Sequence, residues 1–211
     1  MADVAEDNLP AAAEHLRNAR LEEDVYQQHL VSADREVDKI IDRLSKVLAG
    51  SSTLLVQDEL VTELKAIIEV QSGLRDRTAE RGKALLISPD IAGAGKGPLM
   101  QDQAGLIARV ETFIEKLEAA RDEAQDEAAK SRFKQAALIL SPAETGAEIL
   151  KDVLVTDPPV TKVLQAAVDQ IENNEVLYAV DAQDRGLATL KAALQILSAG
   201  QSELADFVAG L

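Results

Sequence analysis

Three groups of residues in this chain have types that can support chemistry: a glycine-rich segment with a lysine, two histidines, and many acids. The glycine-rich segment is Gly93-Ala94-Gly95-Lys96-Gly97. A phosphate-binding loop of the Walker type needs a glycine five positions before the Gly-Lys pair and a serine or threonine directly after the lysine. Asp90 and Gly97 stand at those two positions. We therefore interpret the segment as a flexible connector and not as a nucleotide site.

The two histidines, His15 and His29, do not have the spacing of a known metal centre. Ferritin-like di-metal sites use a Glu-x-x-His pair on each of two helices, whereas Ala12 and Tyr26 stand three residues before these histidines. On one continuous helix the two imidazoles would lie about four turns apart, too far to share a metal ion. We predict two surface histidines and no metal site.

The acids do not form a catalytic pattern either. Glu22-Glu23-Asp24 and Asp122-Glu123 are consecutive in sequence, so on a helix their carboxylates point in different directions. No acidic run has the spacing of a calcium-binding EF-hand loop. The chain has no cysteine and no Gly-x-Ser-x-Gly motif. We expect no catalytic, cofactor-binding or metal-binding residues, no cofactor, and a protein that is not an enzyme.

Composition excludes further classes of function. The 211 residues include 37 acids and 22 Lys and Arg, for a net charge of −15, and the aromatic residues are three Phe and two Tyr. Excess negative charge repels phosphate backbones, and so few aromatics cannot build a base-stacking surface, so we expect no direct nucleic-acid binding. The longest apolar run, residues 136–140, is far shorter than the roughly 20 residues of a membrane span. The acidic N-terminus lacks a secretory signal. We expect a cytoplasmic protein, with a virion as another setting.

The abundance of Ala, Leu and charged residues is typical of long amphipathic helices. Apolar residues recur at steps of three and four, which predicts four long helices, over residues 9–49, 54–81, 99–140 and 158–198. A capping box, Ser141-Pro142-Ala143-Glu144, predicts a short connector helix over 142–154. Gly50 and Asp157-Pro158-Pro159 are expected to separate helices.

These elements predict an all-α fold: an elongated antiparallel four-helix bundle over residues 9–198, coiled-coil-like, with a short connector helix and a short C-terminal helix. Residues 1–8 form an acidic extension before it. Small residues such as Ser72 and Gly73 predict close backbone approach on the second helix. A bundle this slender buries little apolar area per layer, so association with another chain would stabilise it. The first helix offers a long stripe for this, namely Tyr26, Leu30, Ala33, Val37, Ile41, Leu44 and Leu48.

One internal echo supports this division of the chain. Residues 84–89 read Ala-Leu-Leu-Ile-Ser-Pro, and residues 137–142 read Ala-Leu-Ile-Leu-Ser-Pro. An old duplication of a helix followed by a Ser-Pro turn explains the echo, and coincidence in a chain rich in Ala and Leu is the alternative.

The C-terminal segment 201–211 is amphipathic. Its apolar residues fall at i, i+3, i+4 and i+7, the anchor pattern of a helix that binds in a groove, and they are Leu204, Phe207, Val208 and Leu211. We expect Gly200 to uncouple this segment from the fourth helix. The segment then either caps its own bundle or inserts into a neighbouring subunit or partner.

The sequence therefore favours a non-enzymatic structural or adaptor protein that acts through helix–helix packing, as a homo-oligomer or within a larger assembly such as a cellular scaffold or a virion. One alternative is a ligand-sensing or regulatory bundle, with Gln71, Asn173 and Asn174 as polar residues of a cavity. A pocket of ~300 Å³ or more converging on them would favour this alternative. A weaker alternative is an acidic mimic of nucleic acid that binds and inhibits a basic protein.

Overall fold

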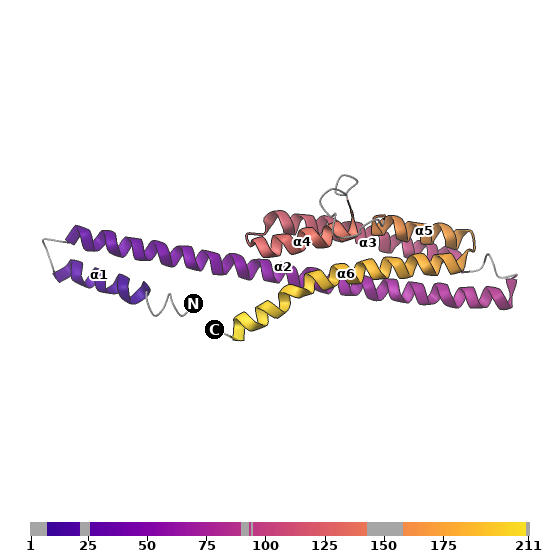
Figure 1. Ribbon diagram of the computed structural model, residues 1–211, viewed down its shortest axis with the longest axis horizontal. Helices are drawn as coiled ribbons and strands as arrows, with labels where there is room; N and C mark the ends of the chain where they lie inside the picture. The colour runs from indigo at the N-terminus through magenta and orange to yellow at the C-terminus, as the bar shows by residue number, and fades with distance from the viewer. Residues whose placement is uncertain (1–7, 22–25, 90–92, 94, 143–157, 210–211) are drawn as a thin grey trace, which may run out of the picture. The chain divides into compact units, whose positions relative to one another are not determined.

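The computed structural model contains helices joined by short turns in the part of the chain that it describes, with no strand among those residues, so the all-α prediction is confirmed. The structure describes residues 8–21, 26–89, 93, 95–142 and 158–209, and their side chains except at 19–21, 46–49, 51 and 200–209. The helices, labelled in Figure 1, are α1 (Leu9–Leu21), α2 (Tyr26–Ile87), α3 (Lys96–Glu123), α4 (Glu127–Leu140), α5 (Val160–Glu172) and α6 (Val176–Ala209).

Contacts group the chain into two compact units. Unit 1 comprises residues 1–54 and 203–211, and unit 2 comprises residues 55–202. The boundaries fall within α2 and α6, so each of these helices contributes to both units.

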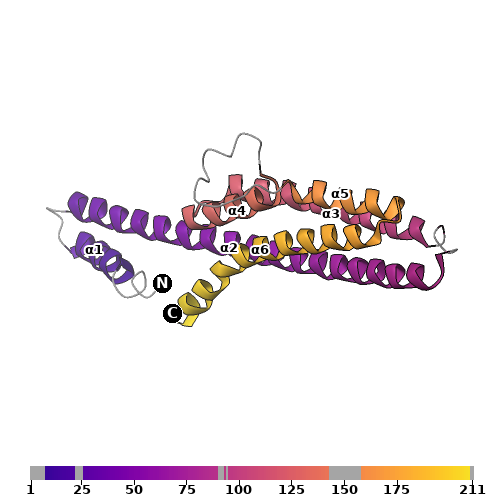
Figure 2. The ribbon, with the colours of Figure 1, turned by 45° about the vertical axis from the view of Figure 1, so that its right-hand side comes forward.

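Unit 2 contains the large apolar core. Within it, α3 packs against both α4 and α5, and Figures 1 and 2 show α3 to α6 alongside the later part of α2. Hydrogen bonds from Lys116 to Glu63 and from Gln103 to Gln71 show that α2 and α3 run in opposite directions. The largest fully buried side chains are leucines with two phenylalanines and two isoleucines, which are Leu64, Ile67, Leu74, Leu106, Phe113, Leu117, Phe133, Leu140, Leu164, Ile171, Leu190 and Leu197.

The predicted helix over 99–140 is two helices in the structure. It begins earlier, at Lys96, and α3 ends where Ala124 adopts an extended conformation with φ −63° and ψ 128°. The Asp126 carboxylate then accepts hydrogen bonds from the backbone N–H groups of Ala128 and Ala129 and caps α4. An Asp at an N-cap satisfies donors that a continuous helix would otherwise pair, so it favours a new helix start.

The predicted helix over 158–198 is also broken, between α5 and α6. Asn174 adopts φ 58°, a left-handed conformation that Asn tolerates better than most residues. The Asn173 N–H donates to the Asp169 carbonyl, and the Glu175 N–H donates to the Gln170 carbonyl. This turn ends α5, and α6 starts at Val176.

Two glycines expected to end helices do not end them. α2 continues through Gly50 to Ile87, well past the predicted end at residue 81, and α6 continues through Gly200 to Ala209. A glycine inside a helix costs about 1 kcal/mol relative to Ala, which is too little by itself to end a long helix. The predicted helix over 9–49 instead breaks earlier, since α1 ends at Leu21 and α2 begins at Tyr26. Residues 1–7 and 143–157, and with them nearly all of the predicted connector helix, lie outside the described residues.

Close backbone approach occurs at glycines other than the one expected. A Cβ placed on Gly73 would meet no atom within 4 Å. A Cβ on Gly82 would lie 2.9 Å from Val176 Cγ1, and one on Gly186 would lie 2.5 Å from Leu164 Cδ2. The second contact brings α6 and α5 together at a point that has no room for a methyl group.

We predict that Gly186→Ala destabilises the protein by about 1–3 kcal/mol, because the added methyl group forces Leu164 out of its packed position. Gly105→Ala is the matched control: Gly105 also lies inside a helix, and its Cβ would meet nothing within 4 Å. That substitution is expected to stabilise α3 by about 0.5–1 kcal/mol. Urea unfolding followed by circular dichroism at 222 nm measures both, and equal effects of the two substitutions would contradict the packing argument.

Candidate functional site

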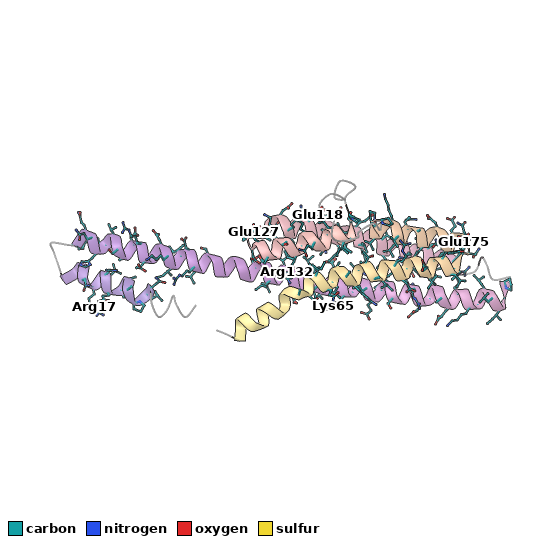
Figure 3. All side chains as sticks on the ribbon, viewed as in Figure 1. Arg17, Lys65, Glu118, Glu127, Arg132 and Glu175 are labelled. Atoms are coloured by element: carbon teal, nitrogen blue, oxygen red, sulfur yellow. The ribbon has the colours of Figure 1, made fainter. Side chains whose placement is uncertain are left out.

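An apolar groove lies between the end of α2 and the start of α6 in unit 2, with a volume of about 430 Å³. We call it the terminal groove. The α2 side consists of Ala79, Gly82, Lys83, Leu85 and Leu86. The opposite side consists of Asn174, Glu175, Val176, Leu177, Tyr178 and Val180, and Figure 3 labels Glu175 at this end of unit 2.

Large apolar side chains of the terminal groove are exposed to an unusual degree. Leu86 is 85% exposed and Leu177 is 84% exposed, while Tyr178 is 66% exposed. Ile87, next to Leu86, is also exposed. Single exposed apolar residues are ordinary, but a group of adjacent ones indicates a surface used for binding.

A buried contact holds the two sides of the terminal groove in place. The buried Arg81 guanidinium donates a hydrogen bond from Nη2 to Asn174 Oδ1 at 3.2 Å. Gly82, the residue after Arg81, lies directly against Val176. These contacts tie α2 to the turn between α5 and α6, so the groove is a formed feature of unit 2.

Only one of the three polar residues proposed for a ligand cavity reaches the terminal groove. Asn174 lines it, as described above, whereas Asn173 is exposed and does not line it. Gln71 is fully buried and hydrogen-bonded elsewhere in unit 2. The groove therefore meets the volume expected of a ligand site without bringing the predicted residues together.

Gln71 belongs to a cluster of buried polar side chains that joins three helices. The Gln103 amide donates from Nε2 to Gln71 Oε1 at 2.8 Å, and its Oε1 accepts from Gln183 Nε2 at 2.9 Å. Gln183 Nε2 also donates to Thr78 Oγ1 at 3.1 Å, and the Thr78 hydroxyl donates to the Leu74 carbonyl. All four polar side chains are fully buried. We call Gln71, Gln103, Gln183 and Thr78 the glutamine cluster.

Sequence reasoning singled out one member of the glutamine cluster. Gln71 was expected to be a polar residue of a ligand cavity, whereas Gln103 and Gln183 were not singled out. A signal for both exists. Gln103 stands between Leu99 and Leu106 at steps of four and three, and Gln183 stands between Ala179 and Leu187 at steps of four.

Ion pairs on the surface of unit 2 agree with the alignment of helices in the glutamine cluster. Arg75 Nε lies 2.9 Å from Asp184 Oδ1, which joins α2 to α6, and Arg77 Nη2 lies 2.7 Å from Asp102 Oδ2, which joins α2 to α3. The hydrogen bond to Asp184 raises the pKa of Arg75 above its ordinary value. Exposed pairs of this kind contribute little to stability, so they follow the register that the buried cluster sets.

The glycine-rich segment has a structural use. Gly95 adopts φ 74° and stands at the N-cap of α3, and Lys96 is the first residue of that helix. Lys96 Nζ donates a hydrogen bond to the backbone carbonyl of Glu172, the last residue of α5. A cation at a helix C-terminus satisfies an unpaired carbonyl and interacts favourably with the helix dipole. The described part of this segment thus joins α3 to α5.

In unit 1, the two histidines lie close together, contrary to the prediction. The chain reverses between α1 and α2, so His15 on α1 and His29 on α2 have ring centroids 6.0 Å apart. The predicted separation of four turns assumed one continuous helix. No group of three or more His, Cys, Asp or Glu side chains that could hold a metal ion occurs among the described residues.

Polar contacts between α2 and the residue before α1 hold this hairpin. Asn8 Nδ2 donates to Glu36 Oε2 at 2.8 Å, and Arg43 Nη1 donates to Asn8 Oδ1. Lys39 Nζ donates to Glu36 Oε1 at 2.6 Å. These hydrogen bonds, that of Lys39 first and that of Asn8 second, lower the pKa of Glu36 below its ordinary value.

The apolar stripe of the first predicted helix is largely exposed in unit 1. Ala33 is buried and Leu30 is half-buried, but Ile41 is 55% exposed, and Val37 and Leu44 are exposed as well. Other exposed apolar side chains of unit 1 are Leu9, Leu16, Tyr26 and Val31. We call Val37, Ile41 and Leu44 the exposed stripe of α2.

The predicted partner-binding residues of the C-terminal segment lie where side chains are not described. Leu204, Phe207 and Val208 fall within α6, which runs to Ala209, and Leu211 lies outside the described residues. The separate C-terminal helix expected after Gly200 is instead the last part of α6.

Comparison with protein-family models, with curated proteins and with solved structures finds no match to this chain. Within the described residues, no helix is both long and apolar enough to cross a membrane.

We predict that Gln103→Leu destabilises the protein by about 2–3 kcal/mol, because it removes the bonds to Gln71 and Gln183 and leaves a buried amide unpaired. Replacing Gln71, Gln103 and Gln183 together by Leu should recover most of this loss, since no amide then needs a partner. Gln101→Leu, at an exposed position of the same helix, should change stability by less than about 0.5 kcal/mol. Chemical unfolding of the four proteins tests this, and a Gln103→Leu protein as stable as the Gln101→Leu control would contradict it.

Proposed function

We propose that this chain is a non-enzymatic structural or adaptor protein that acts by lateral helix–helix packing, and that it self-associates or joins a larger assembly in the cytoplasm or in a virion. The observation that carries this proposal is the exposed stripe of α2 in unit 1. Its residues recur at steps of four and three, as apolar residues do along the seam between packed helices.

Unit 1 has too few described helices to cover this stripe. The buried apolar side chains described there are Ala12 and Ala33, whereas Val37, Ile41 and Leu44 are between 41% and 55% exposed. Burying apolar surface contributes about 25 cal/mol per Å². A helix laid along α2 would therefore gain free energy by covering the stripe.

The charge of this part of α2 suits association between copies of an acidic protein. The whole chain carries −15, so two copies repel each other. Residues 26–50 contain four acids and four bases and are neutral. The acids are Asp34, Glu36, Asp38 and Asp42, and the bases are Arg35, Lys39, Arg43 and Lys46. A neutral apolar stripe is a surface on which two such chains can meet at low electrostatic cost.

A second candidate function is ligand binding by unit 2. The terminal groove exceeds the ~300 Å³ that small-molecule sites usually need, and Asn174 lines it. Leu86, Leu177 and Tyr178, which line it, are each at least 66% exposed, and such an open apolar surface favours a protein partner over a small molecule.

We predict that Val37→Glu combined with Ile41→Glu lowers the mass of the protein in solution. The mass of the wild-type protein, measured by light scattering after size exclusion, should be a multiple of the 22.6 kDa of one chain. The mass of the variant should be smaller. Both side chains are exposed, so the substitutions should leave the helical content unchanged.

The control for added charge is Gln27→Glu combined with Gln28→Glu, at exposed positions of the same helix. This variant also gains two negative charges but keeps the exposed stripe, so its mass should equal that of the wild type. Equal masses of the wild-type and stripe-variant proteins would contradict the proposal of self-association through α2.

The segment 201–211 gives a further test of the proposed contact elements. Residues 203–211 group with residues 1–54 in unit 1, so we expect both to contribute to association. A chain ending at Ala199 should form assemblies with fewer chains than the full-length protein at equal concentration. Light scattering measures the number of chains per assembly. A truncated chain that keeps the number of chains per assembly of the wild type but melts at a lower temperature would show that the segment only caps its own unit.

A further inference from the structure

We infer that the terminal groove of unit 2 is an interface with a second copy of this chain, formed by two-fold pairing of the α2 and α6 sides. This interface goes beyond the proposed function, which rests on the exposed stripe of α2 in unit 1. Three observations carry it: apolar area, the charges on the two sides of the groove, and the contrast between two similar segments of the chain.

Apolar area, together with the two charged side chains of the groove, is sufficient for a specific pair. Leu86, Leu177 and Tyr178 line the groove and are each at least 66% exposed, and the lining residues Lys83 and Glu175 are exposed as well. At roughly 100–150 Å² for each of these side chains, one face offers about 500–750 Å². Two faces together would bury about 1,000–1,500 Å² of polar and apolar surface, which reaches the ~1,000 Å² of a specific interface.

The two sides of the terminal groove carry opposite charges. Lys83 stands on the α2 side and Glu175 stands on the opposite side, and both side chains are exposed. A two-fold axis brings the α2 side of one copy against the α6 side of the other, because an isologous interface pairs residue i with j and j with i. Lys83 of each copy then meets Glu175 of the other, while apolar residues meet apolar residues. The face is therefore complementary to itself.

The two similar segments, residues 84–89 and 137–142, differ in how the rest of unit 2 covers their helix ends, and residues 84–89 end beside the terminal groove. Both segments end a helix in the same way, since the Ser88 N–H donates to the Ala84 carbonyl at 2.9 Å and the Ser141 N–H donates to the Ala137 carbonyl at 2.8 Å. At the end of α4, Leu140 is fully buried by the rest of unit 2, whereas Ile87, its counterpart at the end of α2, is 83% exposed. The same apolar helix end is covered in one place and open in the other, and a second copy supplies the cover.

A chain with two interfaces that each pair like with like forms an assembly larger than a dimer. The terminal groove can therefore be tested separately from the exposed stripe of α2. The test uses the full-length Val37→Glu, Ile41→Glu variant, in which association through the stripe is removed. In this background the protein should remain a dimer, with a mass of twice the 22.6 kDa of one chain, held by the terminal groove alone.

Two sets of substitutions in that background test the groove. Leu86→Glu with Leu177→Glu should give a monomer, while Gln101→Glu with Gln125→Glu adds the same charge at exposed positions of unit 2 and should leave the dimer intact. Lys83→Glu alone and Glu175→Lys alone should each weaken dimerisation about tenfold or more, because each places like charges at both contacts. Sedimentation or light scattering over a concentration series measures the dissociation constants.

Mixing the two single charge variants is the decisive step. A heterodimer of the Lys83→Glu chain with the Glu175→Lys chain has opposite charges at both contacts, so the mixture should regain the dissociation constant of the parent. Repulsion within one chain cannot be relieved by mixing, so recovery would show a contact between chains. The inference would be overturned if Leu86→Glu with Leu177→Glu leaves the mass of the protein in solution unchanged. It would also be overturned if the mixture dimerises as weakly as each charge variant alone. A second result would also overturn the inference: a protein that is a monomer at every protein concentration and binds an apolar dye, with dye binding lost in the Leu86→Glu, Leu177→Glu variant. The groove would then be a ligand site.

Discussion

The register of the helices in unit 2 depends on the need of three buried amides to find partners. Leucine contacts are non-directional, so an interior of leucine alone would tolerate helices displaced along one another. Gln103 donates to Gln71 and accepts from Gln183, which joins α2, α3 and α6 at one level. Any displacement along a helix axis would break these bonds and leave amides unpaired in an apolar interior, where the cost is highest. The glutamine cluster therefore selects one alignment of the three helices.

That alignment also decides where apolar surface stays open. With α2 and α6 held at the level of Gln71 and Gln183, Gly82 meets Val176, and Arg81 meets Asn174 near the end of α2. Among the described residues, none covers Leu86 and Leu177, which remain exposed. In unit 1, the exposed stripe of α2 arises independently, because a hairpin of two helices covers only part of each. The surfaces proposed for assembly are therefore the apolar side chains that the packing within each unit leaves exposed.

Sequence reasoning predicted helical structure correctly, because that prediction depends on a long pattern of residues. It misplaced helix ends, because a helix end depends on one or two residues. The apolar periodicity predicted helices, and most of the described residues lie in helices. The breaks were a different matter: Gly50 was expected to stop a helix and does not, whereas Asp126 and Asn174 interrupt predicted helices. A helix boundary depends on a difference of about 1 kcal/mol between a cap and another helical turn. Packing on either side readily exceeds that difference, so local sequence alone does not locate the boundary.

Helicity and the apolar stripes follow from the sequence by itself, because both depend on the types of residues and their spacing along one chain. Tertiary structure decided which parts of those stripes are covered. Leu140 and Ile87 end similar segments, yet only Leu140 is buried. Likewise, Gln71 was read as a residue of a ligand cavity and instead pairs with Gln103 from another helix. The physical reason is the same in both cases: burial and hydrogen bonding are properties of a side chain together with its neighbours in space, and these neighbours are far away in the sequence.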